Sequence, residues 1–375
     1  MIYLDNAATT GRKPETVIRA VNTALREYSA NPGRSGHRAS ERTALAVYSA
    51  REKAAQMFGA SGAENVVFTS GCTHSINAVV KGVLQSGDRV IISDLEHNSV
   101  LRPLYRIGAQ TDIAQVSFTD DNLTVEGFRR LIRPDTKMIF VTGASNVVGK
   151  CLPISQIAEL CRENGLLFGV DAAQSAGVVS INMERDGIDF LCIAPHKGLY
   201  APMGVGILIA RKPIPYTLIE GGTGTNSESP MQPDFLPERL ESGTVNVPGI
   251  LGAAAGIDFV KKIGQENIHR REMNLTRRAY RALEKIPRVI LYTPMPDIQG
   301  WTPVLSFNID GLPSFETAAQ LGRQGIAVRA GLHCAPGAHR KLGTLETGTV
   351  RICPSVFTTE NEIDYFINCV KKIAK

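Results

Sequence analysis

The sequence predicts an α/β fold in which a parallel sheet is buried between helices. Short runs rich in Val, Ile, Leu and Phe recur along the first half of the chain, and Gly, Asp or Ser bounds them. Continuous apolar runs of this length are typical of strands covered on both faces. Stretches with helical periodicity lie between these runs, and such alternation favours crossover helices and a parallel sheet.

The individual elements follow from local signals. A helix is expected from Ser40 to Phe58, because Ser40 is a suitable N-cap and Gly59 follows the last turn. Another is expected from Pro153 to Asn164, with proline near its start and Gly165 after its end. The buried strands are expected at 66–68, 89–93, 138–141, 166–170, 190–193 and 205–209.

The pattern changes after about Gly249. Two helical stretches, 250–263 and 266–285, precede a strand-like run at 303–309, and a second helix–strand series continues to the C-terminus. We therefore predict three parts. An N-terminal segment (1–15) packs with the small domain, residues 16–246 form a large domain, and residues 247–375 form a smaller α+β domain.

Composition excludes several classes of protein. The 375 residues are 43% hydrophobic and 21% charged, which is ordinary globular usage and argues against disorder or low complexity. No apolar stretch is long enough to cross a membrane. The formal net charge is only +5 without a dense Lys/Arg run, so neither nucleic acid nor a membrane is an expected partner.

Cysteine usage indicates a reducing compartment. The seven cysteines are odd in number and scattered, and no CxxC pair occurs, so neither a disulfide framework nor a metal site is expected. The N-terminus lacks the features of a signal peptide, and we expect a cytoplasmic protein. Most of the cysteines have apolar neighbours, but Cys334 lies in the loop-like stretch Arg-Ala-Gly-Leu-His-Cys-Ala-Pro-Gly.

Two reactive side chains follow predicted strands. Asp171 comes directly after the run at 166–170, and Lys197 follows the run at 190–193. In open α/β sheets, ligands bind at the carboxyl ends of the strands. A lysine there can form a Schiff base with a carbonyl cofactor, and a nearby aspartate can pair with a pyridinium nitrogen. These are the two protein groups that pyridoxal phosphate requires.

A phosphate site and a ring-stacking residue complete the constellation. Residues 69–75 lead from a strand into a helix, so free N–H groups and the helix dipole would face an anion. His97 follows the strand at 89–93 and could stack on a cofactor ring. Four such features, each at the carboxyl end of a strand, together predict a pyridoxal phosphate site.

These residues also resemble a known family. The chain is similar to the fold-type I pyridoxal phosphate enzymes of the class V aminotransferase group, and within it to cysteine desulfurases and selenocysteine lyases. The resemblance runs along nearly the whole chain in one order. It includes segments 3–10, 31–37, 70–77, 96–97, 145–149, 171–174, 196–197, 241–244, 329–334 and 350–351. It implies a large domain with a mostly parallel seven-stranded sheet and a smaller C-terminal α+β domain.

The resemblance assigns cofactor roles in this sequence. Lys197 would hold pyridoxal phosphate and shuttle protons, Asp171 would keep its ring nitrogen protonated, and His97 would stack on its ring. Gln174 would bind the phenolic oxygen. Thr244 would act from the neighbouring subunit, which implies a homodimer with shared sites. The phosphate contacts would come from Cys72 (through its backbone), Thr73, His196 and Thr244.

The resemblance also implies a substrate site and a reaction. Arg351 would clamp the α-carboxylate with its fork of donors, and Asn146, His37 and Arg329 are expected around the substrate. The Cys334 thiolate would attack the sulfur of bound L-cysteine, which would leave L-alanine and a persulfide on Cys334 for a protein acceptor.

Alternatives remain at this stage. The chain could be a selenocysteine lyase or another class V aminotransferase-type enzyme. Cys334 could also be an ordinary loop thiol in a pyridoxal phosphate enzyme that moves no sulfur. A non-enzymatic binding protein with this fold is also conceivable, although Lys197, Asp171 and Arg351 are all present. Ala194 stands where many relatives have a phosphate-binding serine, and His339 is expected at the surface.

Overall fold

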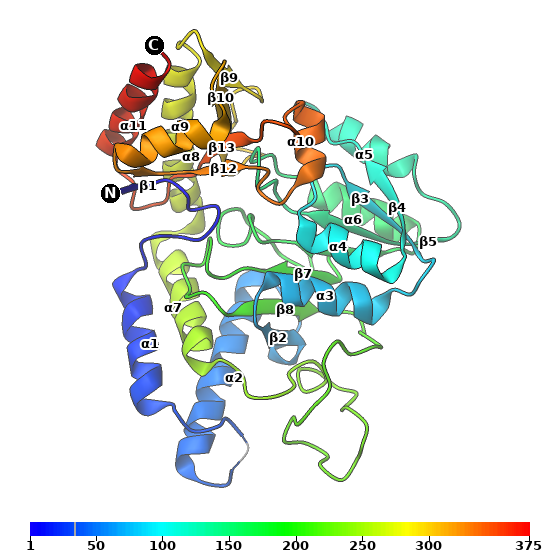
Figure 1. The fold of residues 1–375 in the computed structure, drawn as a ribbon. Helices are drawn as coiled ribbons and strands as arrows, with labels where there is room; N and C mark the ends of the chain where they lie inside the picture. Colours follow the sequence, from blue (N-terminus) through cyan, green and yellow to red (C-terminus); the bar gives the residue numbers. More distant parts are fainter. Residues whose placement is uncertain (34) are drawn as a thin grey trace.

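A seven-stranded sheet occupies the centre of the larger part of the molecule (Figure 1). The computed structural model describes residues 1–33 and 35–375. The strand order is β2-β8-β7-β6-β5-β3-β4. Every neighbouring pair is parallel except those of β8, which runs antiparallel to β7 and β2. The mostly parallel seven-stranded sheet is therefore confirmed.

Its strands are β2 (Val66–Thr69), β3 (Arg89–Ser93), β4 (Gln110–Ala114), β5 (Thr136–Thr142), β6 (Leu167–Asp171), β7 (Phe190–Ile193) and β8 (Gly206–Ala210).

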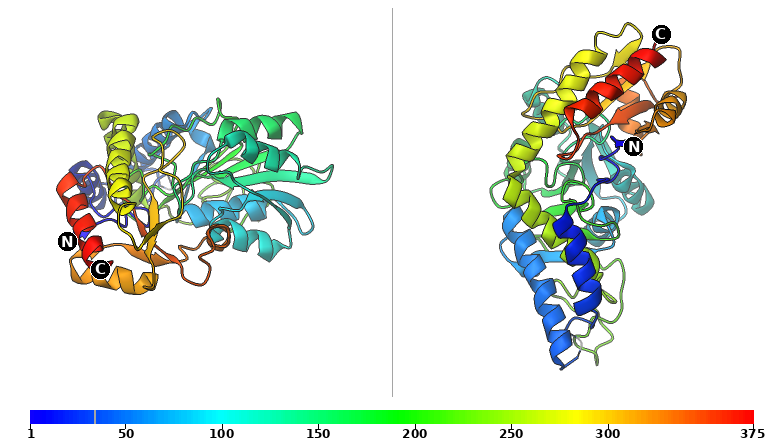
Figure 2. Two further views of the ribbon diagram at one scale, coloured as in Figure 1. Left: turned by 90° about the horizontal axis from the view of Figure 1, so that it is seen from above. Right: turned by 90° about the vertical axis from the view of Figure 1, so that its left-hand side faces the viewer.

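Helices cover both faces of this sheet (Figures 1 and 2). One apolar core lies between the sheet and α2, α6 and α7, and a second lies between the sheet and α3 and α4. The helices of this part are α1 (Glu15–Glu27), α2 (Arg38–Phe58), α3 (Cys72–Val83), α4 (Asn98–Ile107), α5 (Asp121–Arg129), α6 (Ile154–Glu163) and α7 (Val247–Ile263), with a short 3₁₀ helix at Ala63–Asn65.

The C-terminal part has its own sheet and core. The sheet order is β12-β13-β10-β9, all antiparallel. Its core includes residues of α8, α9 and α11. At the other end of the chain, β1 (Ile2–Tyr3) pairs with β11 (Ile326–Ala327). The remaining elements are α8 (Gln265–Leu283), β9 (Val289–Leu291), β10 (Leu305–Ile309), α9 (Ser314–Arg323), β12 (Arg329–Gly331), α10 (Pro336–Leu342), β13 (Thr349–Ile352) and α11 (Glu360–Ile373).

Three local expectations are corrected. Helix α2 begins two residues before Ser40, because the His37 side chain is its cap and accepts from the Ser40 N–H at 3.2 Å. His339 is fully buried rather than at the surface. The edge strand β4 and helix α1 were not expected. β4 is largely exposed and contains Gln and Asp, so it has no continuous apolar run.

Close backbone packing joins α7 to the turn that follows β7. A methyl group added at Gly256 would overlap the backbone carbonyl oxygen of Leu199. In the part of the chain described, no helix is long and apolar enough to span a membrane, and all seven cysteines are free thiols.

We predict that Gly256→Ala destabilises the protein by roughly 1–3 kcal/mol, the usual cost of overpacking. Thermal unfolding would measure the change. Gly322→Ala is the matched control, because Gly322 also lies in a helix but has open space where its Cβ would be. The control should be neutral or stabilising. Equal melting temperatures for Gly256→Ala and the unmodified protein would show that this packing is not tight.

Candidate active site

Lys197 and Asp171 lie at the same edge of the central sheet. Asp171 is the last residue of β6 and pairs in register with Cys192 of β7, while Lys197 lies in the turn that follows β7. Burial lowers the pKa of the Lys197 amine, and the Asp171 carboxylate partly opposes this shift. A lowered pKa increases the neutral fraction of the amine, which is the form that attacks a carbonyl group.

Asp171 is held by two donors. Its side chain is 3% exposed. Oδ1 accepts hydrogen bonds from the Ala173 N–H at 2.9 Å and from the Cys72 thiol at 3.4 Å. Burial raises the pKa of Cys72 well above its ordinary value, and Asp171 raises it further, so this thiol stays protonated and donates. Cys72 therefore contributes its side chain, where the sequence predicted only a backbone role.

The start of α3 is open toward an anion. Gly71 precedes the helix without a side-chain cap, so the first-turn N–H groups are available to a ligand. A Cβ at Gly71 would meet nothing within 4 Å. Thr73, in the same turn, is exposed, and its hydroxyl lies 2.9 Å from that of Ser99. The geometry suits a phosphate group.

His97 has a fixed ring orientation. It is the N-cap of α4, and its Nδ1 accepts from the Ser99 N–H at 3.0 Å and lies 2.8 Å from the Ser99 hydroxyl. Burial lowers its pKa. Because Nδ1 is an acceptor, the neutral ring carries its proton on Nε2. Ser99 thus links His97 to Thr73, a role that no pattern in the sequence indicated.

The N-terminal segment is fastened to the turn that contains His196. The backbone oxygen of His196 accepts from the N–H of Thr10 and from the ammonium group of Lys13, each at 3.1 Å. Burial and the neighbouring cations Lys197 and Lys13 lower the pKa of the His196 ring to about 4. Within the described residues, its buried Nδ1 has no hydrogen-bond partner. His196 is therefore neutral and has a free polar atom beside the site.

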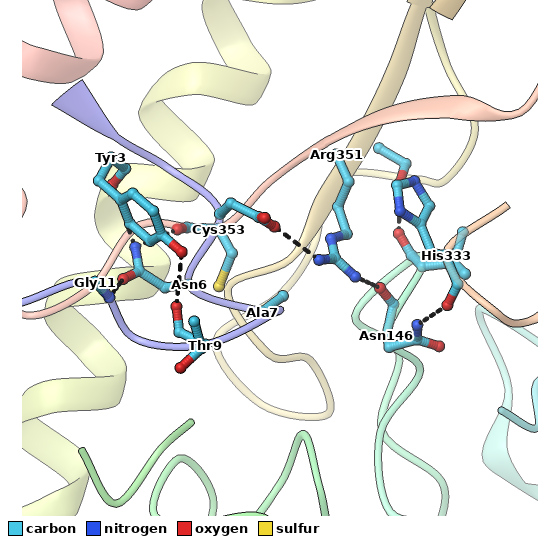
Figure 3. A network of polar contacts seen from close by, with 12 residues as sticks. Tyr3, Asn6, Ala7, Thr9, Gly11, Asn146, His333, Arg351 and Cys353 are labelled. Atoms are coloured by element: carbon cyan, nitrogen blue, oxygen red, sulfur yellow. Dashed lines mark hydrogen bonds and ion pairs between the residues drawn. The ribbon is translucent and has the colours of Figure 1, made fainter. Parts of the chain in front are cut away.

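Arg351 lies at the centre of a network between the two sheets (Figure 3). It is a β13 residue and 1% exposed. Nη1 donates to the backbone oxygen of Asn146, and Nη2 donates to the Asp5 carboxylate, both at 2.9 Å. Its buried Nε has no partner in residues 1–33 and 35–375. Asp5 was not predicted, because its contact with Arg351 joins opposite ends of the chain.

The Cys334 loop is held by the larger part of the molecule. Cys334 is exposed between β12 and α10, and both it and His333 have positive φ angles of 59° and 47°. The Asn98 N–H donates to the Cys334 backbone oxygen at 2.7 Å, and the Asn146 amide donates to that of His333 at 2.6 Å. Left-handed backbone is uncommon for such residues and persists where the surroundings enforce it.

Helix α10, which follows Cys334, is also anchored. Lys341 forms a 2.7 Å ion pair with Asp94, whose side chain is 7% exposed, and lies 5.4 Å from the ring centroid of Phe118. An added Cβ at Gly337 would lie 2.5 Å from the backbone oxygen of Asp94, so α10 packs directly on that residue. This contact fixes the segment next to the exposed thiol.

The other predicted residues have different surroundings. Gln174 is buried, and its amide donates to the Ala7 backbone oxygen at 2.8 Å. Arg329 is opposite Arg351 on the neighbouring strand. His37 is exposed at the start of α2, and Thr244 is exposed after Glu241, which pairs with buried Arg51. The single chain does not bring His37 or Thr244 into the network around Arg351.

The chain matches one family model and several known proteins along nearly its whole length. The family model for class-V aminotransferases matches residues 2–366.

The chain belongs to the class-V aminotransferase family.

A cysteine desulfurase of Haloferax volcanii is 32% identical over 385 residues, covering 99% of this chain and 88% of that protein. A probable cysteine desulfurase of Methanothermobacter thermautotrophicus is also 32% identical, and the alignment covers 100% of this chain and 94% of that protein. The apo structure of a cysteine desulfurase from Thermococcus onnurineus aligns with a TM-score of 0.89 at 31% identity, over 100% of this chain and 94% of that one.

Pyridoxal phosphate is the cofactor of this family, and the residues of this chain fit it. The uncapped start of α3 with open space beside Gly71 suits the phosphate, and the unpartnered Nδ1 of His196 is a further polar contact. The lowered pKa of Lys197 suits a bond to the aldehyde, and Asp171 suits the ring nitrogen. In the described part of the chain, no cluster of three or more His, Cys, Asp or Glu could hold a metal ion.

A second buried carboxyl group lies beside His97. Glu96 is 1% exposed, its Oε1 accepts from the Ser93 hydroxyl and the Thr142 N–H, and its Oε2 has no partner among the described residues. Burial raises the pKa of Glu96 to about 8. The folded protein therefore keeps this acid protonated near neutral pH, whereas the unfolded chain ionises it.

We predict that Glu96→Gln flattens the pH dependence of stability. Between the ordinary glutamate pKa and about 8, the folded state holds a proton that the unfolded state has lost, so stability falls as pH rises through this window. The variant lacks this group, and its melting temperature should decline less from pH 5 to pH 8. An unchanged slope would mean that Glu96 is ionised in the folded protein.

We also predict that Lys341→Gln loosens the Cys334 loop. Loss of a partly buried charged contact costs on the order of 1–3 kcal/mol, so amide hydrogen exchange in residues 332–343 should become about tenfold faster. Lys137→Gln is the control, because Lys137 forms an ion pair of the same 2.7 Å length with Asp88. Unchanged exchange in 332–343, or an equal change in the control, would contradict the anchoring role of Lys341.

Proposed function

We propose that this chain is a pyridoxal phosphate-dependent cysteine desulfurase. It would convert L-cysteine to L-alanine and leave the sulfur as a persulfide on Cys334, from which a protein acceptor would take it. The observation that supports this most directly is the exposed Cys334 thiol on an anchored loop beside the residues that fit the cofactor.

Arg351 and Asn146 would position the substrate. The buried guanidinium keeps Nε free while Asp5 and the Asn146 backbone hold its two other nitrogens. An α-carboxylate can accept from this free donor and the adjacent Nη hydrogens, and a bidentate contact fixes its orientation. Asn146 also holds the Cys334 loop through His333, so the same residue supports the carboxylate clamp and the nucleophile.

Lys197, Asp171 and His97 would handle the protons. When bound, pyridoxal phosphate supplies an electron sink for the substrate carbon skeleton. Burial lowers the pKa of the Lys197 amine, which favours its neutral form, and this form can accept a proton and later return it. Asp171 is kept in place by Ala173 and Cys72. His97, with its proton on Nε2, can donate a hydrogen bond from that atom.

Cys334 would accept the sulfur. Its thiolate forms an S–S bond to the substrate sulfur as the substrate Cβ–S bond breaks, and Cβ gains a proton to become the methyl group of alanine. The substrate sulfur is oxidised and Cβ is reduced, so no external oxidant is needed.

The active form would be a homodimer. Thr244 and His37, which the resemblance assigns to the cofactor and the substrate, are exposed in the single chain. Large apolar side chains are exposed on α1, α2 and the segment before α7, among them Leu25, Leu45 and Phe235. A second copy covering them would bring Thr244 to the partner's site.

We predict that Cys334→Ala retains the cofactor absorbance but loses at least 100-fold in sulfide release from L-cysteine with a reductant, because the attacking group is absent. Cys151→Ala is the control, since Cys151 is a partly buried thiol with no role in the proposed reaction and should retain activity. Lys197→Ala should lose the absorbance of the lysine-bound cofactor. Substantial sulfide release by Cys334→Ala would exclude the persulfide mechanism.

A further inference from the structure

A basic groove runs along the outer face of the C-terminal part, between α8 and α11. These helices lie side by side, yellow and red in Figure 2. The groove has a volume of about 970 Å³. Seven cationic side chains and one carboxylate line it, whereas the formal net charge of the whole chain is only +5. The excess positive charge of the protein is thus concentrated here, and none of the lining residues belongs to the candidate active site. The cations are Arg270, Arg271, Arg277, Arg278, Arg281, Lys285 and Lys371.

Only part of this charge is neutralised within the chain. Arg278 pairs with Asp364 at 2.7 Å and with Glu360 at 3.1 Å, and Arg277 lies 3.5 Å from Asp297. Arg270, Arg281, Lys285 and Lys371 are exposed, and no carboxylate in residues 1–33 and 35–375 lies within 4 Å of them.

The arrangement of the cations is regular. Arg270, Arg277, Arg281 and Lys285 follow one another at spacings of seven, four and four residues along α8 and its C-terminal end, so they share one face of the helix. Like charges at these spacings repel each other and destabilise a helix. In the free chain this repulsion raises the free energy of the folded state, and a bound anionic partner would offset it.

We propose that this groove docks an acidic amphipathic helix of a partner protein. Carboxylates repeated on each turn of such a helix, about 5.4 Å apart, match the spacing of the α8 cations. The arginine fork is suited to bidentate pairing with carboxylates. Half-buried Ala282, which lies on the floor of the groove with buried Leu275, can contact the apolar edge of a helix.

Features of the groove favour a protein over a nucleic acid. Glu360 lines it and Asp364 lies beside it, and these carboxylates repel any anion placed next to them. The carboxylates of a helix are discrete and can be spaced to avoid these two positions, whereas the charges of a phosphate backbone are continuous. Asn267, Asn274 and Thr359 offer both donors and acceptors to side chains. The inference does not depend on the activity of Cys334, so its failure and the failure of the proposed desulfurase activity can be told apart.

The test uses the full-length protein and fluorescence anisotropy. The probe is a fluorescein-labelled helical peptide with a glutamate on every turn of one face and leucines beside it. The variant combines Arg270→Gln, Arg281→Gln and Lys285→Gln. The control combines Arg26→Gln, Arg106→Gln and Lys212→Gln, which removes the same number and kind of exposed cations elsewhere.

We expect the unmodified protein and the control to bind the peptide equally. The groove variant should bind at least tenfold more weakly, and the affinity should fall as ionic strength rises. A peptide of the same composition in scrambled order should bind more weakly. No binding by the unmodified protein, equal losses in both variants, or tighter binding of an oligoribonucleotide of equal charge would each overturn the proposal.

Discussion

The site depends on the parallel alignment of β3, β5, β6 and β7 in the central sheet. Parallel strands end at one edge, and the chain places a reactive side chain at or just after three of these ends: His97 after β3, Asp171 at the end of β6 and Lys197 after β7. The register of β6 against β7 sets Asp171 beside Cys192. These apolar strands are almost fully buried. Their packing therefore fixes the positions of His97, Asp171 and Lys197 at the edge of the sheet.

A second set of contacts joins the C-terminal sheet to this edge. Arg351 bridges Asp5 and Asn146, Asn146 holds the Cys334 loop, and Lys341 holds α10 against Asp94. A buried arginine is costly without a counter-charge, and Asp5 provides it. The N-terminal segment therefore contributes a residue to the candidate site. Asn146 contacts both Arg351, the proposed carboxylate-binding residue, and the loop of the proposed nucleophile.

The sequence predicted the buried parts of the fold well, because continuous apolar runs identify strands covered on both faces. It did not predict β4, since an exposed edge strand has no such run. Ser40 was a reasonable cap by residue type, but His37 provided the capping atom. His339 could not be placed, because its burial depends on packing beneath a loop.

The site residues, too, could be predicted only where a local sequence pattern marks them. Lys197, Asp171 and His97 follow recognisable strands and were predicted, and their burial shifts the pKa of Lys197 and His97 in ways that the sequence does not contain. Asp5 and Lys13 were missed because their partners lie 346 and 183 residues away along the chain. Assignments of Thr244 and His37 remain predictions, since they require a second copy of the chain.

In the proposed reaction, Cys334 receives sulfur from L-cysteine at this site. The most direct measurement is intact and peptide mass spectrometry of the cofactor-loaded protein after one equivalent of L-cysteine without reductant, with the amino-acid product quantified in parallel. We expect a mass increase of one sulfur atom on the peptide containing Cys334 and an equal amount of L-alanine. Alanine without sulfur on Cys334, sulfur on another cysteine such as Cys72, or pyruvate as the product would contradict it.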